Sequence, residues 1–278
     1  MPADRDLTLV LVAHPDDEVL GMAGVIARAV REGLSPTVAI ATNGNAWGSR
    51  EDGLRRDAES VAGLALLGVP REQVVFLGYP DGWLGRLPRF RAGQTYALGG
   101  EYRFLRTGRH ARRTRRNFAR DVRDLVAGAS VVYTHVPFDG HGDHVAVAKQ
   151  VIDAAGSRTE VYGTLMHPPG AGECLELSAS RWPGPAGDPA ARFRPAEELE
   201  PPPSPACAEH PPGRSWGPFG PPHVLLEVPD DMRVADEAVN LKWRAIACHE
   251  SQVGLGPVSA GYMRGFVRQH EVFWRLLT

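Results

Sequence analysis

The apolar positions of the chain fall into short continuous runs separated by amphipathic stretches. Residues 7–13, LTLVLVA, and residues 37–42, TVAIAT, are apolar at almost every position, as expected for strands covered on both faces of a sheet. Between them, residues 18–31 place their apolar side chains at helical spacing, and Gly33 predicts the end of that helix. A buried strand, a helix and a second buried strand are typical of parallel pairing.

The same alternation of strand and helix continues along the chain. Further strands are predicted at residues 74–79, 130–136, 161–166 and 223–228, and further helices at residues 51–67, 117–126, 143–155, 232–249 and 259–277. This order predicts an α/β fold, with a Rossmann-like, doubly wound and mostly parallel sheet and helices on both of its faces. In such sheets, ligands bind beyond the carboxyl ends of the strands.

Two stretches interrupt the pattern and predict loop-rich inserts in a single domain that spans residues 1–278. The first, at about residues 85–116, is basic and includes the run YRFLRTGRHARRTRR. The second, at residues 168–222, holds fifteen of the 24 prolines, and runs such as EPPPSP form neither a helix nor a central strand. Each insert is open to two interpretations, a lid over a substrate or a disordered surface segment. As a functional element, the basic insert would form a rim that attracts an anionic or large polar substrate.

The bulk composition narrows the class of protein without choosing a function. The chain has 278 residues, of which 23 % are charged, and a formal net charge of −2, so its charge favours neither nucleic acid nor a membrane as a partner. No apolar run reaches the ~20 residues that cross a bilayer, and charges stand where a signal peptide has its apolar segment. Three widely spaced cysteines argue against a disulfide framework or a thiolate zinc site. We therefore expect a cytoplasmic protein, whose oligomeric state the sequence leaves open.

Chemistry-bearing side chains are concentrated where the first predicted strand ends. The stretch HPDDE places His14 before Asp16, Asp17 and Glu18. One acidic residue at this point would cap the following helix, because its carboxylate accepts free backbone N–H groups and suits the helix dipole. Two adjacent aspartates plus Glu18 exceed that need, and capping does not explain His14. From this stretch alone, capping and a functional role are equally supported.

A second cluster, in THVPFDGHGDHVAVA, likewise follows a predicted buried strand and precedes a predicted helix. Its potential ligands are His135, Asp139, His141, Asp143 and His144. Two His/Asp clusters at the same edge of a sheet indicate a shared Zn²⁺, because imidazole and carboxylate are its natural ligands where thiolates are absent. We predict three ligands, namely His14, one of the adjacent aspartates and one histidine of the second cluster, with a position left for water. The other aspartate would take a proton from that water.

The two clusters together resemble the signatures of the PIG-L/LmbE-like deacetylases, which are metal-dependent hydrolases that remove N-acyl groups, most often acetyl from N-acetylglucosamine units. The family's AHPDDE stands here at residues 13–18, and its HxDH stands at residues 141–144. RRDAESVAGLALLGV carries Arg56 and Glu59 at the family's R-x-x-E spacing, and LGYPDGWL carries Asp81. KWRAIACHESQV is also similar to the family's C-terminal text, so the resemblance covers most of the chain outside the two inserts.

The resemblance implies a metal centre and a general base. By position, the metal ligands would be His14, Asp17 and His144, and the cation would be Zn²⁺ or another divalent metal. Asp16 would be the general base that removes a proton from metal-bound water. The implied activity is that of a metal-dependent N-deacetylase.

The resemblance also implies residues that would contact the substrate. His141, oriented by Asp143, would polarise the amide carbonyl and stabilise the oxyanion. Arg56 and Asp81 fall where the family contacts the sugar. The expected substrate is a small N-acetylated (N-acylated) amino-sugar compound, with natural-product glycosides of antibiotic biosynthesis among the candidates.

Three other functions are weighed against this one. A metal-dependent amidase acting on a non-sugar N-acyl compound is the main alternative. A nucleotide-binding α/β module would want a Gly-rich turn after the first strand, where this chain has acids. A metal-binding protein without activity is disfavoured because every catalytic position is filled. His249 and Gln252, in CHESQ, either cap a helix end or lie near the site.

Overall fold

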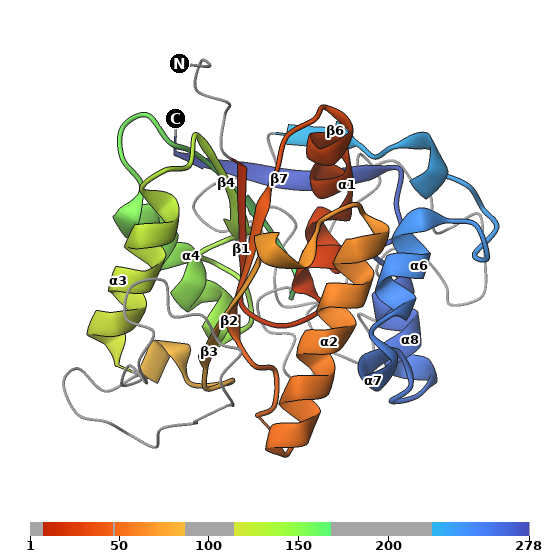
Figure 1. The fold of residues 1–278 in the computed structure, drawn as a ribbon, viewed down its shortest axis with the longest axis horizontal. Helices are drawn as coiled ribbons and strands as arrows, with labels where there is room; N and C mark the ends of the chain where they lie inside the picture. The colour runs from red at the N-terminus through yellow and green to blue at the C-terminus, as the bar shows by residue number, and fades with distance from the viewer. Residues whose placement is uncertain (1–7, 47, 87–113, 168–223, 278) are drawn as a thin grey trace, which may run out of the picture.

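The computed structural model describes residues 8–46, 48–86, 114–167 and 224–277 (Figure 1). Most of the basic insert and the whole of the proline-rich insert, with Cys174 and Cys207, lie outside the described residues. Cys248 is half-buried and carries a free thiol. Among the described residues, none of the helices combines the length and the apolar character that a membrane crossing requires.

The elements follow the predicted alternation, and as far as the fifth strand their bounds lie within two residues of the prediction. The strands are β1 (Thr8–Val12), β2 (Thr37–Thr42), β3 (Val74–Tyr79), β4 (Val131–His135), β5 (Glu160–Thr164), β6 (Val224–Glu227) and β7 (His270–Leu277). The α-helices are α1 (Asp17–Arg31), α2 (Arg50–Leu66), α3 (Arg115–Val126), α4 (Gly142–Ala154), α6 (Leu241–Ala247), α7 (Glu250–Val253) and α8 (Pro257–Arg264). Short 3₁₀ turns cover Arg71–Gln73, Leu84–Arg86 and Asp230–Met232.

In the described part of the chain the strands form one seven-stranded sheet, in the order β3-β2-β1-β4-β5-β7-β6. The first five strands in this order run parallel, whereas β7 pairs antiparallel with both β5 and β6. The predicted α/β fold with a mostly parallel sheet is therefore confirmed. Because β1 lies between β2 and β4, the strand order reverses there, and the carboxyl end of β1 is a topological switch point.

Helices cover both faces of the sheet (Figure 1). α1, α2 and α6 pack together on one face, and α3 packs with α4 on the other. The two faces of β1 enter different apolar clusters: Val10 and Val12 pack with residues of α1, whereas Leu9 and Leu11 pack with residues of α3 and α4. All of β1 is buried, which explains why its sequence shows no alternation of polar and apolar positions.

The C-terminal segment differs from the prediction. The sequence predicts a helix over residues 259–277, but α8 ends at Arg264 and the following segment forms the strand β7. Both faces of β7 are covered, because Phe273 packs in the cluster with α1 while Val272 and Trp274 pack in a separate cluster. A strand with apolar side chains on both faces lacks a period of two, so the apolar spacing was compatible with a helix.

The predicted helix over residues 232–249 is also shorter than expected. α6 begins after Asn240, whose side chain accepts the N–H of Trp243 at 2.9 Å. The same side chain donates to the carbonyl oxygens of Met232 and Val234, both at 2.8 Å. These bonds hold the preceding residues in a turn, so the helix starts only at Leu241.

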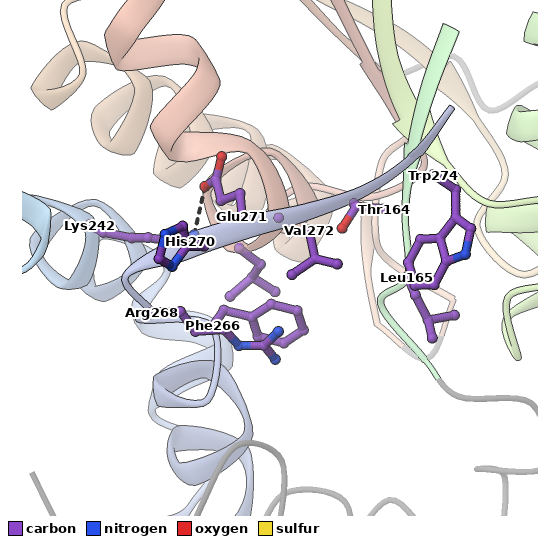
Figure 2. A pocket seen from close by; sticks show the side chains of 11 residues that line it. Thr164, Leu165, Lys242, Phe266, Arg268, His270, Glu271, Val272 and Trp274 are labelled. Carbon is purple, nitrogen blue, oxygen red and sulfur yellow. Dashed lines mark hydrogen bonds and ion pairs between the residues drawn. The ribbon is translucent and has the colours of Figure 1, made fainter. Parts of the chain in front are cut away.

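A buried ion pair links α6 to the C-terminal strand, and its carboxylate also binds the backbone of α1. Nζ of Lys242 on α6 lies 2.7 Å from Oε1 of Glu271 on β7, and Glu271 also accepts the N–H groups of Gly24 and Val25 on α1. These hydrogen bonds offset the desolvation of two buried charges. The pair borders a cavity lined by residues of α1, β5, α6 and β7 (Figure 2). Among the described residues that line this cavity, none is a site residue predicted from the sequence.

Candidate metal centre and active site

The residues predicted from the sequence come together at the carboxyl ends of β1, β3 and β4. Most of them belong to the β1–α1 and β4–α4 turns, which adjoin because β1 and β4 are paired. His14 and His144 are 130 positions apart in sequence, yet their Nδ1 and Nε2 atoms lie 3.1 Å apart. Asp81 follows β3, and Arg56 reaches the same point from α2. The cluster thus occupies the switch point of the sheet, where α/β folds bind ligands.

The side chain of Asp16 does not cap α1. Asp16 is the N-cap residue, yet its carboxylate accepts no hydrogen bond from the first turn of the helix. Its backbone has φ 118°, and no other non-glycine residue in the described ranges has a positive φ. Such a conformation costs about 1–3 kcal/mol and is retained mainly at functional sites. The capping interpretation of HPDDE therefore fails for Asp16.

Three potential ligand atoms converge from the two turns. Nδ1 of His14 lies 3.1 Å from Nε2 of His144, and each of these atoms lies 3.3 Å from Oδ2 of Asp17. All three side chains are buried. With metal–nitrogen bonds of ~2.0–2.1 Å, the edges of a tetrahedral zinc site are about 3.3 Å long. The spacing and the chemistry of these donors therefore fit a cation of the size of zinc.

A carboxylate stands behind each of the two imidazoles. Nε2 of His14 lies 3.1 Å from Oδ1 of Asp81, and Nδ1 of His144 lies 3.1 Å from Oδ1 of Asp139. Asp139 is itself held by the backbone N–H of Met166 at 2.8 Å. Imidazoles that bind metals usually direct their second ring nitrogen at a carboxylate or carbonyl, which sets their tautomer and orientation. The cluster has this arrangement on both histidines.

Two of the possible sets of metal ligands are less favourable, because one member of each set already accepts hydrogen bonds from backbone N–H groups. The described residues contain three overlapping sets that could hold a metal: His14, His141 and His144; Asp17, His135 and His144; and His14, Asp81 and Asp143. In the second set, Nε2 of His135 already accepts the N–H of Ala13 at 2.9 Å. In the third set, the two oxygens of Asp143 accept the N–H groups of Gly82 at 2.6 Å and Leu84 at 2.9 Å. The first set stays free of this objection. Oδ2 of Asp17 also accepts a backbone N–H, that of His14 at 2.8 Å, but it lies 3.3 Å from both Nδ1 of His14 and Nε2 of His144, so these three atoms form a candidate donor set beside the first one.

The charges of the cluster favour a cation. Burial opposes a charged imidazole, yet Asp17 and Asp139 raise the pKa of His144 to about 9. Burial is outweighed in the same way at His14, whose pKa lies well above its usual range because of Asp143 and other nearby carboxylates. In the metal-free protein, the nearby carboxylates therefore favour the charged form of each imidazole, and a bound cation would have to displace any proton from the nitrogen that it takes.

His141 is arranged to donate a hydrogen bond. Its Nδ1 accepts the backbone N–H of Asp143 at 3.2 Å, which leaves the proton of the neutral ring on Nε2. Burial, helped by the neighbouring rings of His14 and His144, lowers the pKa of His141 and so favours the neutral ring. The ring centroid lies 4.6 Å from that of His14 and 4.9 Å from that of His144. Its Nε2–H could therefore donate to an oxygen of a molecule bound at the cluster.

Among the described residues, no hydrogen bond joins the carboxylate of Asp143 to the side chain of His141. The carboxylate faces the loop after β3 instead. Gly82 and Leu84 donate to its two oxygens, and one of these oxygens lies 3.5 Å from Nε2 of His14. The orienting contact that the resemblance implies between Asp143 and His141 is made here by the backbone N–H of Asp143. Its carboxylate instead shapes the loop that carries Asp81.

Arg56 holds the turn that contains Asp16. Its guanidinium donates to the carbonyl oxygens of Gly44 at 2.5 Å and Pro15 at 2.7 Å, and to Oδ2 of Asp16 at 2.9 Å. Burial raises the pKa of Asp16 to about 6, and the charge of Arg56 opposes that shift. A carboxyl group with such a pKa can take up and return a proton near neutral pH.

Asp81 is engaged by the protein on both of its oxygens. Oδ1 faces His14, and Oδ2 accepts the backbone N–H of Ala46 at 3.1 Å. Burial works against ionisation, but contact with His14 lowers the pKa of Asp81 to about 2. The sugar contacts that the resemblance implies for Arg56 and Asp81 stay a prediction.

Sequence reasoning missed several side chains that surround the cluster. The ring of His167 lies 5.1 Å from that of His144 and 5.6 Å from that of Tyr262, whose hydroxyl donates to the carbonyl of Met166 at 3.0 Å. The ring of His135, which the sequence had already indicated as a potential ligand, also stacks on that of His144, at 3.8 Å. The available signal for His167 was its position directly after the fifth predicted strand, at the same edge of the sheet as the two motifs.

Comparison with known proteins bears out the resemblance seen in the sequence. Residues 9–155 match the PIG-L family, described as GlcNAc-PI de-N-acetylase. This range is more than half of the chain and includes both HPDDE and HGDH. A relative from Nakamurella multipartita, 1D-myo-inositol 2-acetamido-2-deoxy-alpha-D-glucopyranoside deacetylase, is 34 % identical over 165 residues. That match covers 52 % of this chain and 53 % of the relative, so the chain spans about half the length of the relative it matches.

Two solved structures share the fold over nearly the whole chain. A conserved protein from Thermus thermophilus has a TM-score of 0.52 and 20 % identity, with 98 % of this chain and 95 % of that chain covered. A triple mutant of a deacetylase involved in the teicoplanin biosynthetic pathway has a TM-score of 0.53 and 17 % identity, with 97 % of each chain covered. At these identities the likeness concerns the fold.

Proposed function

Because the chain belongs to the PIG-L family, we propose that it is a metal-dependent N-deacetylase that hydrolyses the N-acetyl amide of an amino-sugar compound. The observation that supports this most directly is the convergence of His14, Asp17 and His144 beside the carboxylate of Asp16. Their ligand atoms are separated by 3.1–3.3 Å, and the side chains come from two turns that are distant in sequence. A chain that used these residues only for folding would have little reason to bury so many ionisable groups together.

The proposed metal ligands are Nδ1 of His14, Oδ2 of Asp17 and Nε2 of His144, with zinc as the preferred cation. A divalent cation held there would polarise the substrate's amide carbonyl and lower the pKa of a coordinated water. Asp81 and Asp139 would hold the two imidazoles in the tautomers that leave these nitrogens free to bind.

The proton transfers fall to Asp16. Its carboxylate would accept a proton from the attacking water and then deliver that proton to the nitrogen of the leaving amine. The raised pKa of Asp16, which burial causes, suits a group that must both accept and donate near neutral pH. The products would be a carboxylate, acetate in the simplest case, and a free amino sugar.

His141 would stabilise the negative charge that develops on the amide oxygen. Its Nε2 carries the proton of the neutral ring, because Nδ1 is taken by the N–H of Asp143. A preorganised donor of this kind contributes about 3–4 kcal/mol to stabilisation of a transition state. The same donor would also orient the substrate carbonyl before attack.

The amino-sugar substrate is proposed from the family and from the relative. The family is described by an N-acetylglucosaminyl lipid, and the Nakamurella multipartita protein is named for a 2-acetamido-2-deoxyglucopyranoside of inositol. N-acetylglucosaminides are therefore the first compounds to test, followed by N-acylated glycosides of natural products. A non-sugar N-acyl amine is the alternative substrate.

We expect acetate release from N-acetylglucosaminides to exceed that from a simple N-acetyl amine by on the order of 100-fold in kcat/KM. The remote sugar contacts supply binding energy that is used at the reacting amide. The measurement is acetate release by purified, metal-loaded protein across an N-acetylglucosaminide, an N-acylated natural-product glycoside and a simple N-acetyl amine. Turnover confined to the simple amine would favour the amidase alternative, and no release from any compound would remove the deacetylase proposal.

Metal binding is expected to weaken as the pH falls. The pKa values of His14 and His144 are raised in the metal-free protein by nearby carboxylates, so a cation must displace one or two protons at neutral pH. Each displaced proton weakens the apparent affinity about tenfold for each pH unit below the pKa. Calorimetric titration with Zn²⁺ in two buffers of different ionisation enthalpy measures the number of protons released for each zinc ion bound. A release of no protons between pH 6 and 8 would contradict the proposed ligands.

A further inference from the structure

Glu18 is a buried acid for which the proposed reaction has no use. It stands in the first turn of α1, directly after the proposed ligand Asp17, and its side chain is fully inaccessible to solvent. Burying a carboxylate is unfavourable unless the carboxylate is hydrogen-bonded or paired. Its contacts should therefore reveal why an acid stands at this position.

One oxygen of Glu18 fastens the backbone of Asp16. Oε2 accepts the N–H of Asp16 at 2.9 Å. Asp16 is the residue with φ 118°, a conformation that side-chain-bearing residues adopt only when their surroundings enforce it. The direction of the Asp16 side chain depends on this φ, so the hydrogen bond from its N–H bears on where its carboxylate lies.

The other oxygen of Glu18 faces a histidine from the C-terminal part of the chain. Oε1 lies 3.5 Å from Nε2 of His249, which is also fully buried and is the residue that precedes α7. A Cβ atom on Gly63 of α2 would lie 3.5 Å from the same Nε2, so the imidazole lies beside α2 as well as beside Glu18. His249 therefore packs against the Glu18 carboxylate from a segment that is distant in sequence.

The opposite side of the Asp16 turn is held by Arg56. Its guanidinium binds the carbonyl of Pro15 and the carboxylate of Asp16. Asp16 is thus held at its carboxylate by Arg56 and at its main chain by Glu18. We propose that Glu18, backed by His249, is a positioning residue that directs the Asp16 carboxylate at the substrate. This inference rests on the proposed function, in which Asp16 is the general base.

A helix cap is the competing explanation. A side chain in the first turn that accepts the N–H of the N-cap residue forms half of a capping box, which stabilises the helix. A cap of this kind would lower the thermal stability of a variant without changing the turnover of the folded fraction. The positioning role instead predicts that kcat falls and that this fall depends on the carboxylate of Asp16.

The test compares Glu18→Met with Glu18→Gln in the full chain loaded with Zn²⁺. Methionine has a similar volume but offers no oxygen to Asp16, whereas glutamine keeps an acceptor in the same place. We expect Glu18→Met to lower kcat by about 10- to 100-fold with KM changed less than about twofold and with full zinc content. Glu18→Gln should recover most of that kcat. If Glu18→Met does not fold, Glu18→Asp serves instead, because its shorter side chain withdraws the acceptor while keeping the charge.

A double-mutant cycle with Asp16→Asn separates positioning from capping. If Glu18 acts through Asp16, adding Glu18→Met to Asp16→Asn lowers kcat by less than about twofold further. An additive loss, a normal kcat in folded Glu18→Met, or equal losses in the Met and Gln variants would overturn the positioning role. Failure of the proposed function would be visible in a different variant. A normal kcat in Asp16→Asn alone would show that Asp16 is not the base, independently of any result for Glu18.

Discussion

Replacement of Asp16 by asparagine is expected to lower kcat by about 10²- to 10⁴-fold and to leave the metal content unchanged. Asparagine has the shape of aspartate, can still accept the hydrogen bond from Arg56 and does not alter the proposed ligands. It cannot take a proton from water near neutral pH. The measurement is acetate release from an N-acetylglucosaminide, with zinc quantified in the same preparation.

Asp121→Asn is the matched control for this change. Asp121 is another buried aspartate, but it lies on α3 at the opposite face of the sheet and accepts the hydroxyl of Tyr79 at 2.5 Å. Asparagine can accept the same hydrogen bond, so kcat should stay within about twofold of the unaltered protein. A near-normal kcat for Asp16→Asn would show that another group carries the proton, and zinc loss in this variant would show that Asp16 is a ligand.

Replacement of His144 by alanine is expected to reduce zinc affinity by at least about 10³-fold and to abolish measurable turnover. The change removes one of three proposed donors and leaves Asp139 and Asp17 without the imidazole that each contacts at 3.1–3.3 Å. A catalytic zinc site has only three protein ligands to share its binding free energy, so the loss of one donor is severe. Zinc per chain after gel filtration, together with acetate release, measures both effects.

His270→Ala provides the comparison for His144→Ala. His270 is a partly buried histidine at the start of β7, and it borders the cavity of Figure 2 instead of the cluster. Its removal should leave zinc content and kcat unchanged. Chelation of the unaltered protein should reproduce the inactivity of His144→Ala, and added Zn²⁺ should restore activity only in the unaltered protein. Full activity of the chelated protein, with no residual metal, would refute the metal-dependent proposal.

The parallel core of the fold could be predicted because its strands are buried on both faces. β1 and β2 are covered by helices on each side, and their continuous apolar text identified them with bounds correct to within one residue. Burial on both faces also explains why β7 was wrongly predicted as a helix. Phe273 and Trp274 enter different clusters, and the resulting apolar spacing also suits a helix. The antiparallel addition of β7 and β6 depends on pairing with β5, which local patterns do not report.

The convergence of the site could also be predicted, but its internal contacts could not. Two His/Asp motifs at the ends of buried strands had to meet once those strands paired, as His14 and His144 do. Asp81 and Asp139 stand behind these imidazoles because of loop geometry that has no period or spacing in the sequence. The same holds for His249, whose contact with the first motif comes from a segment more than two hundred positions away.

Because β1 pairs with β4, binding of the proposed ion would depend on the folded state. The donors on either side of this strand pair belong to chain segments that the unfolded polypeptide keeps far apart, so only the native state can present them to one cation. By thermodynamic linkage, the ion would then add its own binding free energy to the free energy of unfolding, about 2.7 kcal/mol at a concentration one hundred times the dissociation constant. The cell's supply of metal would in this way govern how much of the protein survives, as well as how fast it works.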